Sequence, residues 1–193
     1  QRPVKILEVG TAVGFSALLM AENTAEECKI TTIENYEKRI PIARENFKRG
    51  GMEHRITLLE GDATEILKEL QGTYDFIFMD AAKGQYLNFL PDLLRLLAED
   101  GMLVSDNVLQ DGDLMESRYA VTRRNRTIHS RMRDYLYELK NNSMLETVIL
   151  PTPVLTDDCY FANDTARHPF IYVRYLKRDV IFAHLFKKLA GEA

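Results

Sequence analysis

Short apolar runs alternate with helical patterns over residues 4–150. Bulky apolar and β-branched residues, in runs that often end on an acidic residue, predict strands at 4–9, 29–34, 55–60, 74–80, 102–106 and 145–150. Between these runs, apolar residues recur at helical spacing and predict helices at 16–21, 36–49, 64–70, 86–97 and 121–140. Strands that alternate with helices form a mostly parallel sheet covered on both faces. The pattern therefore predicts an α/β protein with a doubly wound sheet.

The same pattern divides the chain into a core at 1–150 and a less regular C-terminal segment at 151–193. Residues 151–169 show no periodicity, whereas 170–176 predict a strand and 180–189 a terminal helix. We expect Pro41 in the first turn of its helix, and we expect Pro91 to break or begin the next to last one. No repeat or linker separates the two parts.

Composition narrows the class of protein further. The 193 residues carry a net charge of −4, which argues against a protein that coats nucleic acid with a globally basic surface. Cys28 and Cys159 form no metal or redox motif, so we expect a reducing compartment. No apolar run approaches the roughly 20 residues that span a bilayer, and no leader is visible, so we expect a cytoplasmic protein with no membrane partner. The first strand begins almost at Gln1, so we also expect that earlier residues are missing.

The first strand leads into the loop Glu8-Val9-Gly10-Thr11-Ala12-Val13-Gly14-Phe15-Ser16. Glycine lets such a loop approach a ligand, and the following helix offers unpaired N–H groups. The spacing matches neither the dinucleotide fingerprint nor the P-loop. Glu8 would repel a pyrophosphate but suits a cationic ligand with an amino group, such as S-adenosylmethionine. The alternative is a plain tight turn.

Acidic residues also stand at or just after the ends of the second and third predicted strands. Glu34 stands where an acid can accept hydrogen bonds from both hydroxyls of a ribose. Asp62, within Gly61-Asp62-Ala63, stands where a side chain could face an adenine amino group. Each could instead be a solvated carboxylate, but three acidic signals after three consecutive strands favour a nucleoside ligand.

A second group of polar residues follows the fourth and fifth predicted strands. Asp80 ends one strand, and Asp106 and Asn107 follow the next, so their side chains should meet at one edge of a parallel sheet. Two carboxylates and an amide oxygen suit Mg²⁺. Lys83 would place an ammonium group beside them. The alternative is that Asp80 and Asp106 cap a helix and a turn.

These motifs, which lie in the first 110 or so residues, resemble the metal-dependent O-methyltransferases related to catechol and caffeoyl-CoA O-methyltransferases. Within them, the chain looks most similar to the bacterial branch that methylates 5-hydroxyuridine in tRNA. The resemblance implies a class I, Rossmann-like methyltransferase fold, an S-adenosylmethionine cofactor, bound Mg²⁺ at Asp80, Asp106 and Asn107, and Lys83 as general base beside Asp80. The candidate cofactor-binding residues are Glu8, Gly10, Thr11, Gly14, Ser16, Glu34, Gly61, Asp62, Ala63 and Asp80. Relatives usually carry helices before the first strand and form dimers, so we expect a homodimer although those helices are absent here.

The acceptor is the open question. From Arg118 to Lys140 the chain carries seven basic and two acidic side chains, a net charge of +5. Arg123, Arg124 and Arg126 could contact phosphates, or could line a solvated helix face. With the resemblance, 5-hydroxyuridine in tRNA is the favoured acceptor. The alternatives are a small catechol or phenolic thioester, which also presents two adjacent oxygens, or a non-catalytic module that binds S-adenosylmethionine. His129 on the same helix is predicted to be a surface or packing residue.

Overall fold

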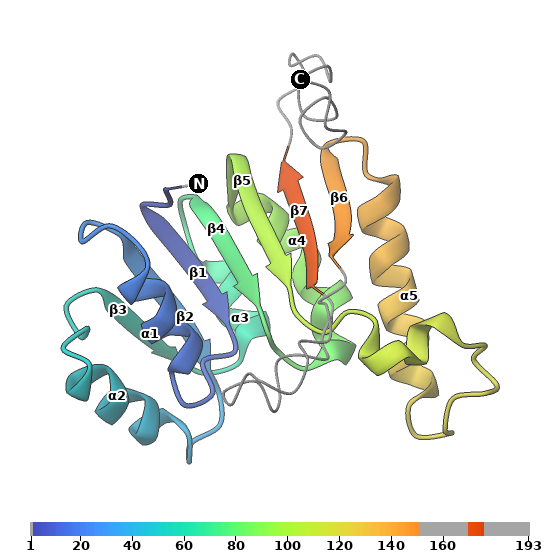
Figure 1. Cartoon of the computed structure of the whole chain (residues 1–193), viewed down its shortest axis with the longest axis horizontal. Helices are drawn as coiled ribbons and strands as arrows, with labels where there is room; N and C mark the ends of the chain where they lie inside the picture. Colours follow the sequence, from blue (N-terminus) through green and yellow to red (C-terminus); the bar gives the residue numbers. More distant parts are fainter. Residues whose placement is uncertain (1, 151–169, 176–193) are drawn as a thin grey trace, which may run out of the picture.

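A computed structural model describes residues 2–150 and 170–175. Its centre is a seven-stranded sheet of order β3-β2-β1-β4-β5-β7-β6 (Figure 1). The strands are β1 Lys5–Val9, β2 Lys29–Glu34, β3 Ile56–Glu60, β4 Tyr74–Met79, β5 Leu97–Ser105, β6 Leu145–Leu150 and β7 Phe170–Tyr175. β1 to β5 pair in parallel, and β7 runs antiparallel to both β5 and β6. This arrangement confirms the predicted α/β fold with a mostly parallel sheet.

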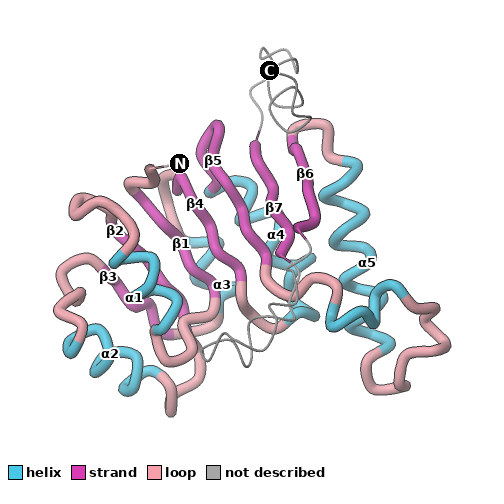
Figure 2. The backbone as a smooth tube through the Cα atoms, viewed as in Figure 1, coloured by secondary structure: helices cyan, strands magenta, loops and turns pink. Residues whose placement is uncertain are grey.

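Five α-helices and two 3₁₀ turns connect the described strands (Figure 2). The helices are α1 Phe15–Glu22, α2 Ile40–Arg49, α3 Ala63–Glu69, α4 Tyr86–Leu96 and α5 Arg126–Asn141, and the turns are η1 Lys83–Gln85 and η2 Gln110–Met115. Pro41 lies in the first turn of α2, as predicted. Pro91 lies inside α4 without ending it, which corrects the expected break.

Side chains alternate across the central strands and build a core on each face. On one face, Ile6 and Ile30 pack with Ala17 of α1 and Phe47 of α2. On the other face, buried residues of β1, β4 and β5 pack with α3, α4 and α5; they include Leu7, Val9, Ile77, Met79, Leu103, Leu67, Leu93 and Tyr135. Two covered faces explain why the central strands read as continuous apolar runs.

Three predicted boundaries were wrong by four or more residues, each for a local reason. The helix predicted at 121–140 begins only at Arg126, because residues 123–125 form a turn. The helix predicted at 36–49 begins at Ile40, and residues 37–39 also form a turn. β5 begins at Leu97 and not at residue 102, because residues 98–101 form an irregularity within its pairing with β4.

A strand occupies 170–175, within the stretch where the sequence predicts one, and it lies between β5 and β6. The predicted terminal helix at 180–189 lies outside the described residues. None of the described helices is long and apolar enough to cross a membrane.

Candidate functional site

The loop after β1 and the end of β4 touch at the carboxyl edge of the sheet. The backbone N–H groups of Gly10 and Thr11 both donate to the Ile33 carbonyl at 3.1 Å, which ties the loop to β2. Gly10 has a φ of +106°, and a Cβ there would lie 2.0 Å from the carbonyl oxygen of Asp80. Only glycine permits this approach, so the first loop and the predicted metal site form one structure.

A cavity of about 560 Å³ opens beside this contact. Its volume is in the range of small-molecule and cofactor sites. Of the sequence-predicted residues, six line it: Gly10, Glu34, Gly61, Asp62, Ala63 and Asp80. Sequence reasoning missed several others, among them Ala12, Tyr36, Arg39, Gln85 and Phe89. Tyr36 and Arg39 lie in the irregular stretch that was predicted as helix, where periodicity gave no sign of a ligand.

Glu34 is held rigidly at the wall of the cavity. Its Oε2 accepts the N–H of Ala12 at 2.8 Å, and its Oε1 accepts the N–H groups of Asn35 at 3.0 Å and Tyr36 at 2.8 Å. A carboxylate has about four lone-pair sites, so capacity remains for a hydroxyl donor. Such a fixed acceptor suits a ribose, because its direction is set before the ligand arrives.

Asp62 plays a local role as well as lining the cavity. Its Oδ1 accepts the N–H of Thr64 at 2.7 Å and caps the first turn of α3. This backbone hydrogen bond lowers the pKa of the Asp62 carboxyl. The residue is therefore an anion that lines the cavity, and a carboxylate suits a ligand amino group.

Glu8, Thr11 and Ser16 belong to the first loop but do not line the cavity. Glu8 is completely buried, and its carboxylate accepts hydrogen bonds from the hydroxyls of Ser16 and Thr32. Thr32 also contacts the Thr11 hydroxyl at 2.6 Å. Burial raises the pKa of Glu8 to about 7. These side chains stabilise the loop by hydrogen bonds on the face of the sheet that α1 covers. Glu8 faces α1 because successive side chains of β1 point to opposite faces of the sheet.

Gly14 also lies away from the cavity. Its φ is +86°, and a Cβ there would lie 2.5 Å from the Phe47 ring. The residue therefore lets the start of α1 pack closely on α2.

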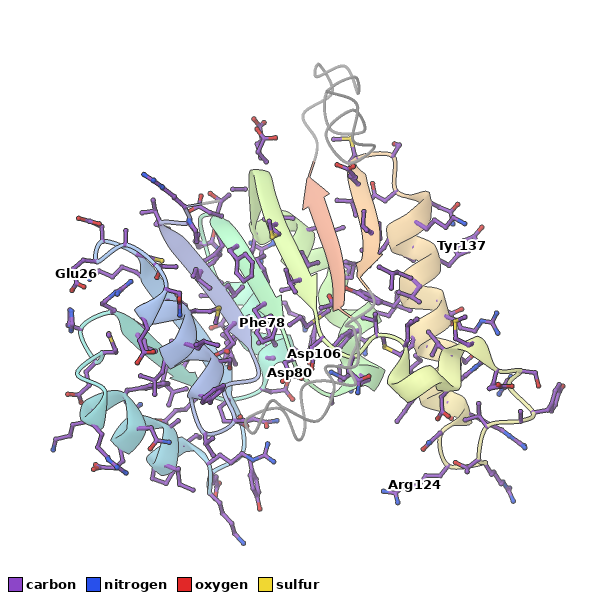
Figure 3. The ribbon with its side chains drawn as sticks, viewed as in Figure 1. Glu26, Phe78, Asp80, Asp106, Arg124 and Tyr137 are labelled. Carbon is purple, nitrogen blue, oxygen red and sulfur yellow. The ribbon has the colours of Figure 1, made fainter. Side chains whose placement is uncertain are left out.

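Asp80 and Asp106 lie near each other where β4 and β5 end (Figure 3), and Lys83 lies beside both. Lys83 Nζ lies 3.2 Å from Asp80 Oδ1 and 3.9 Å from Asp106 Oδ2. Lys83 is the first residue of the turn η1, and the Arg131 guanidinium of α5 donates to the Gly84 carbonyl of that turn at 3.0 Å. The hydrogen bond from α5 therefore fixes the turn η1, and with it the position of Lys83.

Asn107 completes the group with an unusual backbone and an unpaired oxygen. Its φ is +46°, and among the described residues its buried side-chain oxygen is one of two such atoms with no hydrogen-bond partner. A buried acceptor without a donor is costly, so it indicates a missing partner. In the described part of the chain, no three His, Cys, Asp or Glu side chains are grouped so that they alone could hold a metal ion. Two carboxylates and an amide oxygen nevertheless fit a hard divalent cation such as Mg²⁺.

The predicted phosphate-binding arginines do not share one helix face. Arg123 and Arg124 are exposed on the turn before α5, and Arg124 lies at the edge of the molecule, away from Asp80 (Figure 3). Arg126 begins α5 and donates to the carbonyls of Val121 and Tyr119 at 3.3 and 3.4 Å. It holds the loop together, and the structure does not bring it to the cavity.

His129 is buried, which confirms the packing alternative for it. Its Nε2 lies 3.2 Å from the Glu116 carbonyl.

The sheet order with an antiparallel β7, and a cavity at the carboxyl edge of its parallel strands, define the Rossmann-like fold of class I methyltransferases. Comparison with known sequences then gives the family. The chain belongs to the O-methyltransferase family, whose sequence model matches residues 3–154.

Individual relatives agree with this assignment. A catechol O-methyltransferase from Niastella koreensis is 33% identical over 115 residues, which cover 58% of this chain and 52% of that protein. Caffeoyl-CoA O-methyltransferase 2 from Populus trichocarpa is 31% identical over 159 residues, which cover 75% of this chain and 62% of that protein. The chain thus spans between half and two thirds of the length of these relatives. The crystal structure of an SAH-bound methyltransferase from Podospora anserina is 28% identical, with a TM-score of 0.74 over 91% of this chain and 73% of that one.

Proposed function

We propose that this protein transfers the methyl group of S-adenosylmethionine to a hydroxyl of a small catechol or phenolic acceptor. The observation that carries the proposal is that the candidate cofactor site and the candidate metal site adjoin each other. The cavity with Glu34 and Asp62 suits a nucleoside, and it is also lined by Asp80, whose neighbour Lys83 lies beside Asp106 as well. The similarity to catechol and caffeoyl-CoA O-methyltransferases supports an acceptor with adjacent oxygens.

The reaction needs little covalent chemistry from the protein. The acceptor oxygen attacks the methyl carbon in line, the carbon–sulfur bond breaks, and its electrons stay on the sulfur of S-adenosylhomocysteine. Glu34 and Asp62 would hold the donor by its ribose and adenine. Asp80, Asp106 and Asn107 would hold a divalent cation, which when bound lowers the pKa of the acceptor hydroxyl. Lys83, in its amine form, would take the hydroxyl proton.

A radiolabelled methyl-transfer assay tests the proposal. Purified protein is given S-adenosylmethionine, Mg²⁺ and either catechol or caffeoyl-CoA, with and without a chelator. We expect transfer that chelation abolishes, and a loss of about 100-fold or more in Asp106→Asn. Asp75→Asn is the matched control, since Asp75 is at the far end of β4 and accepts the N–H groups of Val4 and Lys5, a role that asparagine can keep. Methyl transfer that is unchanged both by chelation and by Asp106→Asn would refute the role of a metal ion in the reaction.

A second acceptor, 5-hydroxyuridine in tRNA, is favoured by one observation. Arg118, Tyr119, Arg123 and Arg124 are all exposed on the segment between η2 and α5, which combines positive charge with an aromatic ring. Phosphates and bases bind such surfaces. The double variant Arg123→Glu/Arg124→Glu should abolish tRNA methylation and leave phenol turnover intact, whereas Arg2→Glu/Lys5→Glu at the opposite edge should change neither. Binding of S-adenosylhomocysteine without turnover on either acceptor would instead indicate a non-catalytic module.

A further inference from the structure

The Tyr86 hydroxyl joins three segments that the proposed reaction depends on. Tyr86 is the first residue of α4 and is completely buried. Its oxygen accepts a hydrogen bond from Lys83 Nζ at 2.8 Å. Its proton is directed toward the carbonyl of Met79 at 2.9 Å, with the carbonyl of Asp106 at 3.2 Å. One hydroxyl therefore touches the lysine turn, the residue before Asp80, and Asp106 itself.

A core position does not require this hydroxyl. Phe89, one turn further along α4, is also buried and has none. The ring of Tyr86 packs edge-on against Tyr135 of α5, with ring centres 5.5 Å apart, and a phenylalanine would keep that contact. What phenylalanine would lose is the link between the ends of β4 and β5 and the acceptor for Lys83.

We propose that Tyr86 is a positioning residue. Its hydroxyl fixes the Lys83 side chain beside the acceptor and sets the spacing of the two strand ends that carry Asp80 and Asp106. This role rests on the proposed function, because it matters only if those carboxylates hold a cation and Lys83 takes a proton. Partners behind metal ligands typically change metal affinity or activity by about 10- to 100-fold when they are removed.

Tyr135 supplies a matched control. It is as completely buried as Tyr86 and lies in the same ring pair, and its hydroxyl contacts Ser105 Oγ at 2.7 Å. Among the described residues, Tyr86 bonds to Lys83 and Tyr135 does not. Tyr86→Phe and Tyr135→Phe therefore remove the same group from the same core, and only the first removes a contact with Lys83.

Two measurements separate positioning from stability. Mn²⁺ affinity is measured by electron paramagnetic resonance in the presence of S-adenosylhomocysteine, and kcat and KM are measured for the acceptor. In Tyr86→Phe we expect Mn²⁺ affinity and kcat each to fall by roughly 10- to 100-fold, with affinity for S-adenosylhomocysteine unchanged. In Tyr135→Phe both should stay within about 3-fold of the wild type, even if the melting temperature drops equally. Equal effects of the two variants on metal affinity and kcat would overturn the proposal.

A double-mutant cycle tests the connection with Lys83. If Tyr86 acts through the lysine, the kcat of Lys83→Met should fall little further when Tyr86→Phe is added, because neighbours that act as a unit are not additive. If the effects of the two substitutions on kcat were fully additive, Tyr86 would not act through Lys83. A wild type that neither binds Mn²⁺ nor transfers methyl groups would refute the proposed function instead, so the two failures are distinguishable.

A labelled protein that keeps the hydroxyl covers the case in which Tyr86→Phe does not fold. 3-Fluorotyrosine is incorporated at position 86 alone, or at position 135 alone, and followed by fluorine NMR. We expect the resonance at 86 to shift on addition of Mg²⁺ and in the Lys83→Met background, and the resonance at 135 to move far less. An unresponsive signal at 86 would refute the positioning role.

Discussion

Replacing Gly10 with alanine tests whether the cofactor loop and the end of β4 are in contact. A side chain at a φ of +106° costs about 1–2 kcal/mol in backbone strain. The added Cβ would also lie 2.0 Å from the Asp80 carbonyl oxygen, and overpacking of this kind costs about 1–3 kcal/mol. Together they make about 3 kcal/mol, which lowers the melting temperature of a domain of this size by about 10 °C.

Gly72→Ala separates the cost of backbone strain from the cost of the steric clash. Gly72 has a φ of +82°, and a Cβ there meets nothing within 4 Å, so only the backbone strain remains. We expect its melting temperature to fall by about 4 °C. Thermal unfolding followed by circular dichroism gives both values, and calorimetric titration with S-adenosylhomocysteine gives the affinity. Methyl transfer should fall by about 100-fold in Gly10→Ala, because a small displacement of reacting groups is costly, and should be unchanged in Gly72→Ala. Equal melting temperatures and activities for the two variants would refute the close approach.

Three further predictions concern buried or fixed side chains. Burial raises the pKa of Glu8 to about 7 from 4.5, so the folded state binds that proton more tightly than the unfolded state. Between pH 4.5 and 7 the free energy of unfolding contributed by this group should therefore fall as pH rises, by up to about 1.4 kcal/mol per pH unit, and urea unfolding of Glu8→Gln should lack this slope. Arg55 is buried and donates to backbone carbonyls including that of Ala21 at 2.7 Å, so Arg55→Met should lower stability in urea by about 3 kcal/mol. Arg44→Met removes only an exposed ion pair and should cost under about 1 kcal/mol. Glu34→Gln should weaken S-adenosylhomocysteine binding by about 10-fold in calorimetric titration, because an amide nitrogen cannot accept the N–H bonds that fix this side chain; unchanged affinity would remove Glu34 from the donor site.

The sequence predicted the sheet well because its strands are covered on both faces. A strand such as Tyr74–Met79 is apolar almost throughout, so its limits and the position of Asp80 at its carboxyl end could be predicted to within one residue. The α5 boundary was harder, because Val121 is buried and continues the apolar spacing although the chain is turning there. Periodicity records burial, and a buried residue in a turn looks the same as one in a helix.

The candidate site shows a similar division. Residues at or just beyond the end of a strand, such as Glu34 and Asp106, could be located because parallel strands end at one edge. Glu8 was expected to face the ligand because it stands at the start of the loop, but its carboxylate is buried against hydroxyls of α1 and β2, which only the folded chain brings to it. The sequence did not indicate a role for Tyr86, because an aromatic residue at the start of a helix is ordinary. Its three hydrogen-bond partners come together only in the folded chain.

The antiparallel strand β7 has a consequence for how the protein is made. Leu103 of β5 pairs with Val173 of β7, so the strand that carries Asp106 at its end gains its second neighbour only after about 70 more residues have been synthesised. Until then, one side of β5 presents unpaired backbone groups that could pair with another nascent chain. During synthesis on the ribosome, the end of β4 that carries Asp80 should therefore reach its final position early. The end of β5 that carries Asp106 should reach its final position last.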